Sequence, residues 1–210
     1  MYCWFMPLPR FHRLAYDRQR HILDVARGHF ARHGPDAASY NKIIESAGVS
    51  KTASYQYFDG KDDLLATVLD EVRDHLLAAL GPWEPAESCS EFRARLDGGS
   101  RALLAHLHEH PEDLALADLA IGRTGEAQWL GWFEAVVDNG QALGLIRTDL
   151  DRSLLVATTA AVMRAADTWT LARLRSGDGQ DTAQIAGQVG ALLAGLWNGG
   201  SDEGRAGDAH

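Results

Sequence analysis

Cysteine is scarce in this chain, where only Cys3 and Cys89 occur among 210 residues. Two isolated cysteines do not make a disulfide framework or a thiolate zinc site, so we expect reduced thiols in a cytoplasmic protein. Long apolar runs are also missing, and no segment has the length of apolar sequence that crosses a bilayer. We therefore expect no membrane partner.

The opening ten residues, MYCWFMPLPR, are apolar but short, and Pro7 and Pro9 interrupt them. They lack the basic start and the small-residue cleavage site of a signal peptide. We expect a disordered N-terminal arm over residues 1–14, and the sequence leaves open whether Met1 or Met6 is the initiator.

Several catalytic signatures are absent as well. The chain has no nucleophile elbow, Gly-rich phosphate loop or dinucleotide fingerprint, so we expect a protein that is not an enzyme and needs no cofactor. His106, His108 and His110 are close in sequence, but only the first and last share a helix face. No carboxylate or cysteine pattern completes a zinc signature. We expect no metal, with a metal effector as the minor alternative.

Basic residues are fewer than acidic residues in this chain, and they are unevenly distributed along it. The net charge is −9. Residues 1–64 have nine Lys/Arg and seven Asp/Glu, whereas residues 65–210 have eleven and twenty-two. Only the first segment is suited to a polyanion such as nucleic acid.

Strand-like alternation is missing, whereas helical spacing is plentiful. Apolar residues spaced by three or four precede a stop signal at Gly34-Pro35, and a second such series over residues 64–80 precedes Gly81-Pro82. Similar patterns predict helices capped by Ser90 and Asp151, a helix with Pro111 in its first position, and further helices from about Glu126 and up to Trp197.

These patterns predict an all-α fold of about nine helices. A first helical domain is expected over residues 15–60 and a second over residues 61–197, followed by a disordered tail over residues 198–210.

The segment SYNKIIESAGVSKTASYQYFDGK has the pattern of a helix-turn-helix. A short helix over residues 39–47 buries Ile43 and Ile44, Gly48 permits the turn, and Ser50 caps a second helix over residues 51–58. An ordinary helical hairpin is the alternative. It does not account for the polar and aromatic side chains crowded on the second helix, which suit phosphate and base contacts. They are Lys51, Thr52, Ser54, Tyr55, Gln56 and Tyr57.

The run GVSKTASYQYFDGKDDL resembles the signature of the tetracycline-repressor (TetR/AcrR) family, for which GVSKGTLYYYFxxKxxL is a typical form. The resemblance extends back through RQRHILDVARGHFARHG and AASYNKIIESA and covers roughly residues 18–72. It implies a homodimer that binds palindromic operator DNA through a three-helix helix-turn-helix DNA-binding domain over residues 15–60. It also implies that residues 61–197 form a helical effector-binding and dimerisation domain, which binds a small-molecule effector. Position by position, it implies base contacts by Asn41, Lys51, Thr52 and Gln56, and phosphate contacts by Ser39, Ser50, Tyr55, Tyr57 and Lys61.

The chain departs from the family pattern at four positions. Thr52 replaces a frequent Gly, Ser54 a bulky apolar residue, Ile44 a small alanine, and Gln56 a frequent aromatic residue. The first three keep open the alternative of a ligand-binding helical dimer without specific operator recognition. Gln56 retains the amide needed for a bidentate contact to adenine.

The C-terminal part is rich in aromatic and apolar side chains. These favour either core packing or a largely apolar effector pocket with a few polar anchors. The candidate pocket residues are Phe92, Leu103, His106, Trp129, Phe133, Met163 and Asp167. The last two helices are rich in Ala and Gly, which suits either the homodimer interface or a buried pair within one chain.

Overall fold

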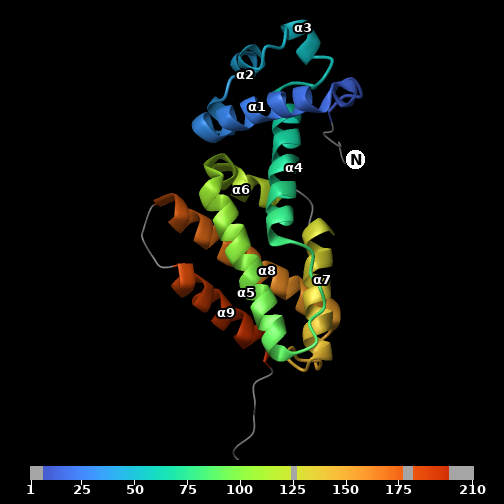
Figure 1. Ribbon diagram of the computed structural model, residues 1–210, viewed down its shortest axis with the longest axis vertical. Coiled ribbons are helices and arrows are strands. Elements are labelled where there is room, and N and C mark those ends of the chain that lie inside the picture. Colours follow the sequence, from blue (N-terminus) through green and yellow to red (C-terminus); the bar gives the residue numbers. More distant parts are fainter. Residues whose placement is uncertain (1–6, 124–126, 177–181, 199–210) are drawn as a thin grey trace, which may run out of the picture. The chain divides into compact units, whose positions relative to one another are not determined.

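The computed structural model of the chain describes residues 7–123, 127–176 and 182–198. Within these ranges the backbone forms one 3-10 helix and nine α-helices, and no strand (Figure 1). The predicted all-α fold is confirmed. The helices are η1 (Phe11–Arg13), α1 (Tyr16–Ala37), α2 (Tyr40–Ser46), α3 (Lys51–Ser54), α4 (Lys61–Leu80), α5 (Cys89–Glu109), α6 (Pro111–Arg123), α7 (Ala127–Ala142), α8 (Arg152–Ser176) and α9 (Thr182–Trp197). None of the helices described here is both long and apolar enough to span a membrane.

The chain divides into two compact units. The first contains the described residues of Met1–Leu80 and Ala102–Gly125, and the second those of Gly81–Arg101 and Glu126–His210. This division differs from the expected boundary after residue 60. The first unit includes α4 and α6 because α1 packs against both of them.

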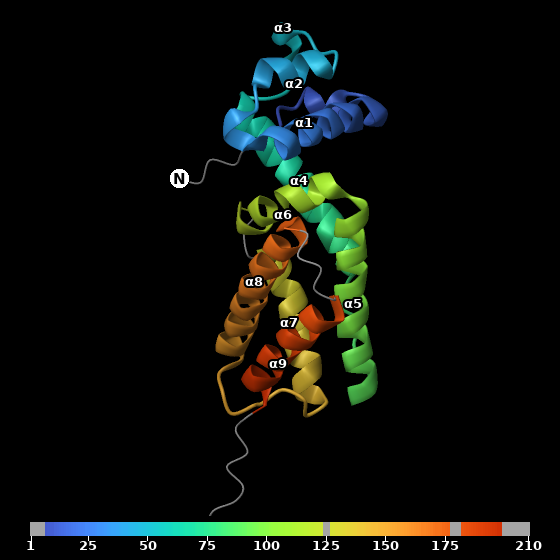
Figure 2. The ribbon, with the colours of Figure 1, turned by 90° about the vertical axis from the view of Figure 1, so that its left-hand side faces the viewer.

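In the first unit, α1 also packs against α2, and α2 packs against α3 (Figures 1 and 2). Phe30, Ile43, Leu64 and Val72 are fully buried in this unit, which explains the apolar spacing of the sequence. The regular part of α1 ends at Gly34, whose φ of 74° lies in the left-handed region that favours glycine.

The segment before α1 is ordered where it is described, which corrects the expected disorder over residues 7–14. The backbone N–H of Leu8 donates to the Tyr57 carbonyl at 2.8 Å. The ring of Phe11 is buried, with its centroid 4.8 Å from that of Phe58. One large apolar side chain and one backbone hydrogen bond therefore hold this segment, which is too short to show periodicity. Met1 and Met6 lie outside the described residues.

The second unit is built on α7, α8 and α9, since α8 packs against both of the others. Its core contains Phe92, Val137, Leu155 and Trp197, all buried. Trp197 Nε1 donates to Thr159 Oγ1 at 3.0 Å, which satisfies two buried polar groups at once.

The helix starts follow most of the predicted caps. Asp151 Oδ1 accepts from the backbone N–H groups of Ser153 and Leu154 at 2.9 and 3.2 Å, so the predicted cap of α8 is confirmed. Pro111 is the first residue of α6, as predicted. For α5 the predicted cap at Ser90 is wrong, because Ser88 Oγ accepts from the Glu91 N–H at 3.2 Å. The predicted start of α7 at Glu126 and the tail over residues 199–210 lie outside the described residues.

Candidate nucleic-acid interface

Buried apolar side chains hold α2 and α3 in place. Ile43, Ile44, Val49 and Phe58 are all buried in the first unit. Gly48 forms the turn with a φ of 63°, as its place in the sequence predicts. Its carbonyl accepts from Arg18 Nη2 at 2.7 Å, so α1 also braces the turn.

The predicted cap of α3 is present, but the helix is shorter than expected. Ser50 Oγ accepts from the Ala53 N–H at 3.2 Å. Helix α3 ends at Ser54 rather than at Phe58. The N–H groups of Tyr57 and Phe58 both donate to the Ser54 carbonyl, at 3.0 and 2.9 Å, which closes a turn instead of extending the helix.

The side chains expected to contact DNA lie at or near the surface of α2, α3 and the following turn. Asn41, Lys51, Thr52 and Gln56, the expected base contacts, are all exposed. Among the expected phosphate contacts, Ser50 and Tyr55 are exposed, whereas Ser39, Tyr57 and Lys61 are partly buried.

Tyr55 is a large aromatic side chain that is 52% exposed. Its ring centroid lies 5.9 Å from that of Tyr40, which supports it from α2. Burial raises the pKa of Tyr40, so its hydroxyl is neutral at physiological pH. The Tyr55 ring is therefore supported by Tyr40 on one side while about half of the residue remains exposed to solvent.

Two of the expected DNA contacts already have partners within the chain. Lys61 Nζ donates to the Pro35 and Asp36 carbonyls at 2.8 and 3.0 Å. Its ammonium therefore ties the start of α4 to the end of α1. Gln56 Oε1 accepts from Arg10 Nη1.

Ser54 and Ile44, two departures from the family pattern, are interior residues. Ser54 is fully buried, and its hydroxyl donates to the Lys51 carbonyl at 2.8 Å. Ile44 is buried as well. These two departures therefore alter the packing beneath the surface, whereas Thr52 and Gln56 alter the exposed face.

Sequence reasoning missed Arg10, Phe11 and Arg18. Arg10 contacts Gln56, Phe11 packs on Phe58, and Arg18 binds the turn at Gly48. The only available signal for Phe11 was an aromatic residue shortly before the first helix. No sequence pattern indicates the contacts of the two arginines, because their partners lie 46 and 30 residues further along the chain.

The candidate pocket residues are divided between the two units. Leu103 and His106 belong to the first unit, and the other five belong to the second. Phe92 and Phe133 are core residues, and Trp129 and Met163 pack against that core. The Nε1 atom of Trp129 is buried without a hydrogen-bond partner. Asp167 is partly buried.

Comparison with known proteins agrees with this geometry. The family profile described as bacterial regulatory proteins, tetR family, matches residues 22–68. The HTH-type transcriptional regulator AcrR of Shigella flexneri is 29% identical over 101 residues, or 46% of this chain. The match spans 40% of the length of AcrR, so it concerns less than half of that protein.

Solved structures share the fold over most of the chain. The regulator FadR from Bacillus subtilis, in complex with stearoyl-CoA, aligns with a TM-score of 0.63 at 16% identity, over 85% of this chain and 99% of that one. A tetR-family regulator from Shewanella sp. PV-4 aligns with a TM-score of 0.61 at 18% identity, over 86% of this chain and 97% of its own. Residues 22–68 are therefore similar to the tetR family of bacterial regulatory proteins, and the fold of the chain is similar to that of solved regulators over most of its length.

Proposed function

We propose that the chain is a homodimeric transcriptional regulator that binds palindromic operator DNA and is released by a small molecule. The observation that carries the proposal is the exposed face of α2, α3 and the following turn. Asn41, Lys51, Thr52 and Tyr55 are exposed there on a buried apolar scaffold. The stability of the unit does not explain this concentration of donors, whereas recognition of base edges and phosphates does.

In this proposal α3 enters the major groove. Lys51, Thr52 and Gln56 then contact base edges together with Asn41 from α2. Ser39, Ser50, Tyr55, Tyr57 and Lys61 contact the phosphate backbone. Gln56 Oε1 must exchange its Arg10 partner for a base, and Arg10 is then available to a phosphate.

The proposed homodimer interface consists of α8 and α9. Leu154 and Leu192 are 51% and 60% exposed in the single chain. The small residues beside them are exposed too, which argues against the alternative that they serve a close pair within the chain. They are Ala157, Ala161, Ala165, Gly187, Gly190, Ala191 and Ala194. Small residues allow two helices to approach closely, and exposed leucines beside them can be buried between two chains. This surface is therefore suited to pack against the same surface of a second copy of the chain.

The proposed effector is a largely apolar small molecule that binds in the second unit. The aromatic core there includes Trp129, whose buried N–H group lacks an acceptor. An acceptor atom of the effector would satisfy this group. Because coupling between two binding sites is reciprocal, an effector that weakens DNA binding must itself be bound more weakly by the DNA complex.

DNA binding by the chain and two variants tests the proposal. Fluorescence anisotropy with DNA flanking the gene should show specific binding. Lys51→Ala should weaken it at least about fivefold, because a lost base contact costs roughly 1–3 kcal/mol. Tyr55→Phe, which removes only a hydroxyl, should weaken it less and equally on all sequences.

The matched control is Arg101→Ala, an exposed basic residue far along the sequence from α3. It should leave DNA affinity unchanged, and all variants should unfold at the temperature of the parent chain. Equal DNA affinity of the parent and Lys51→Ala would favour the alternative, a ligand-binding dimer without operator recognition.

A further inference from the structure

Asp113 is a carboxylate buried in the first unit, on α6, with only 2% of its side chain exposed. Its Oδ2 atom lies 2.9 Å from His75 Nδ1 on α4 and 2.9 Å from His106 Nε2 on α5. Three helices therefore direct their side chains to one point. The first turn of α6 alone would explain an exposed acidic residue, but not this convergence.

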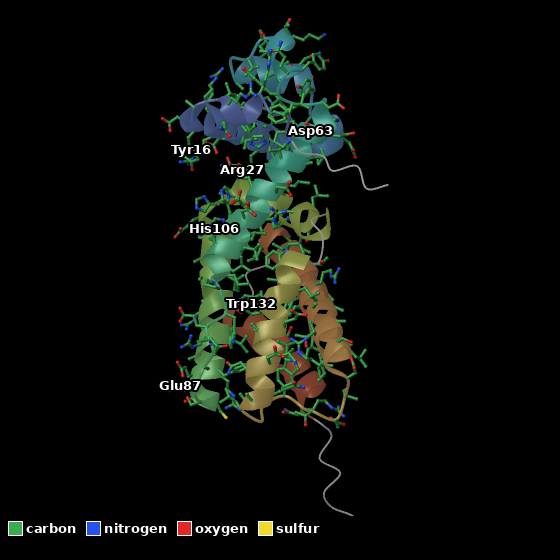
Figure 3. The ribbon with its side chains drawn as sticks, turned by 90° about the vertical axis from the view of Figure 1, so that its right-hand side faces the viewer. Tyr16, Arg27, Asp63, Glu87, His106 and Trp132 are labelled. Carbon is green, nitrogen blue, oxygen red and sulfur yellow. The ribbon has the colours of Figure 1, made fainter. Side chains whose placement is uncertain are left out.

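The second carboxylate oxygen of Asp113 is poorly satisfied. Its Oδ1 atom is buried and accepts no hydrogen bond. The nearest cation is Arg27 of α1, whose Nε lies 3.5 Å away. Arg27 is also paired with Asp24 at 2.6 Å and with Glu71 at 3.1 Å (Figure 3 labels Arg27 and His106).

The cluster therefore has an excess of negative charge. With both imidazoles neutral, the buried Asp113 and the partly buried Glu71 carry two negative charges against the single positive charge of Arg27. The third carboxylate, Asp24, also pairs with Arg27 but is 44% exposed. Burial of a net charge is costly unless a counter-ion compensates it. A divalent cation has the charge that this cluster lacks.

We propose that His75, His106 and Asp113 bind a divalent transition-metal ion of the zinc type. The three donor atoms lie within 4.8 Å of one another. Tetrahedral zinc with bonds of about 2.0–2.1 Å needs donors about 3.3–3.4 Å apart. The two distances to Asp113 Oδ2 are 2.9 Å, so these two pairs have to separate by a few tenths of an ångström. The third pair, the two imidazole nitrogens, lies within 4.8 Å.

The donor chemistry also selects the metal. Two imidazoles and one carboxylate suit zinc and similar transition ions better than calcium or magnesium, which prefer oxygen ligands. Three protein ligands leave a fourth position for water or for an effector atom. The His75 side chain is 36% exposed, which provides a route for the ion.

Occupation of this site would change the contacts of α1. The ion would take up Asp113 Oδ2, which His75 and His106 now contact, and it would repel the Arg27 guanidinium beside Oδ1. Arg27 is on the helix that also braces the helix-turn-helix through Arg18. A consequence for DNA affinity rests on the proposed function, whereas metal binding itself does not.

Calorimetric titration of the full chain with zinc chloride, after removal of metal with a chelator, tests the site. We expect one tight ion per chain. His75→Ala and His106→Ala should each weaken binding at least about tenfold, since even indirect supports of a metal site have effects of this size. His108→Ala, which removes an exposed histidine of the same helix, should bind zinc as the parent chain does.

Cobalt substitution provides a second readout. The parent chain and His108→Ala should show the visible absorption of tetrahedral cobalt, and His106→Ala should lose it. Asp113→Asn replaces the carboxylate ligand of the ion with an amide of the same shape, and it should weaken zinc binding. This variant tests the site if an alanine variant fails to fold. Absence of tight zinc binding by the parent chain, or equal binding by folded His75→Ala and His106→Ala, overturns the site.

DNA binding by the metal-free chain separates the two proposals. If the chain binds DNA but shows no tight zinc binding, the metal proposal alone is overturned. If the chain binds zinc but does not bind DNA, the proposed function alone is overturned.

Discussion

At the scale of single residues, two glycines of α7 have different surroundings. A Cβ atom added at Gly140 would lie 2.5 and 2.6 Å from the Cδ1 and Cγ1 atoms of Ile146, and 3.3 Å from Phe92 Cζ. A Cβ atom added at Gly131 would meet nothing within 4 Å. The loop after α7 therefore packs directly on the helix backbone at Gly140, which the sequence pattern alone did not indicate.

Substitution of these glycines by alanine should change stability in opposite directions. Gly140→Ala should lower the free energy of unfolding by roughly 1–3 kcal/mol, because Ile146 is buried and has to shift. Gly131→Ala should raise it by roughly 0.5–1 kcal/mol, because alanine is the better helix former. Urea unfolding monitored by circular dichroism measures both, and equal effects would contradict the packing described for α7.

Asp63 gives rise to a pH dependence of stability. Its Oδ2 accepts from the Asp59 N–H at 2.9 Å, but the side chain is buried and Oδ1 has no hydrogen-bond partner. Burial raises the pKa of Asp63 despite the bond from Asp59. The folded chain thus binds this proton more tightly than the unfolded chain, so this carboxyl group reduces stability as pH rises through its folded pKa.

Asp63→Asn removes the charge and keeps an oxygen to accept from Asp59. We expect the melting temperature of the variant to exceed that of the parent at roughly pH 7, and the difference to shrink toward roughly pH 4. Thermal unfolding across this range measures the effect. A variant that is less stable than the parent at neutral pH would show that the favourable position of Asp63 at the start of α4 outweighs its burial.

At the scale of elements, the long helices follow the sequence closely, because each buries one apolar face. The stop signal at Gly34-Pro35 marks the end of the regular part of α1, and that at Gly81-Pro82 directly follows α4. Helix α3 is shorter than predicted, because main-chain bonds to Ser54 close a turn that side-chain patterns do not encode. The order of residues 7–14 depends on tertiary contacts of Phe11, which local sequence does not reveal.

The N-terminal segment should contribute to the stability of the first unit. Phe11→Ala should lower the free energy of unfolding by about 3 kcal/mol, since a buried phenylalanine is lost. Arg13→Ala, an exposed neighbour, is the matched control and should have little effect. Chemical unfolding measures both, and a similar small effect of the two substitutions would mean that the segment is not held by Phe11.

At the scale of the whole molecule, the sequence located the proposed DNA-binding face but not the histidine cluster. The residues of α2 and α3 are contiguous in sequence, so a motif describes them. His75 and Asp113 are 38 residues apart on different helices, and only the packing of α4 on α6 brings them together. The expectation of no metal site was based on the neighbours of His106 along the chain, whereas the site proposed above is formed by its neighbours in space.

Assembly is predicted to depend on α8 and α9. Leu192→Glu should convert the proposed homodimer to a monomer in light scattering, because two charges would face each other across the two-fold axis. Leu119→Glu changes another exposed leucine, on α6, and should leave the dimer intact. A dimer that persists in Leu192→Glu would place the interface elsewhere.

The exposed face of α2, α3 and the following turn is the proposed DNA-binding surface. The most direct measurement is the affinity of the full chain for fragments flanking its gene, taken over a series of salt concentrations. We expect tight binding to a fragment with a palindromic site, with the logarithm of the association constant falling linearly as the logarithm of salt rises. Absent or salt-insensitive binding to every flanking fragment would contradict the claim.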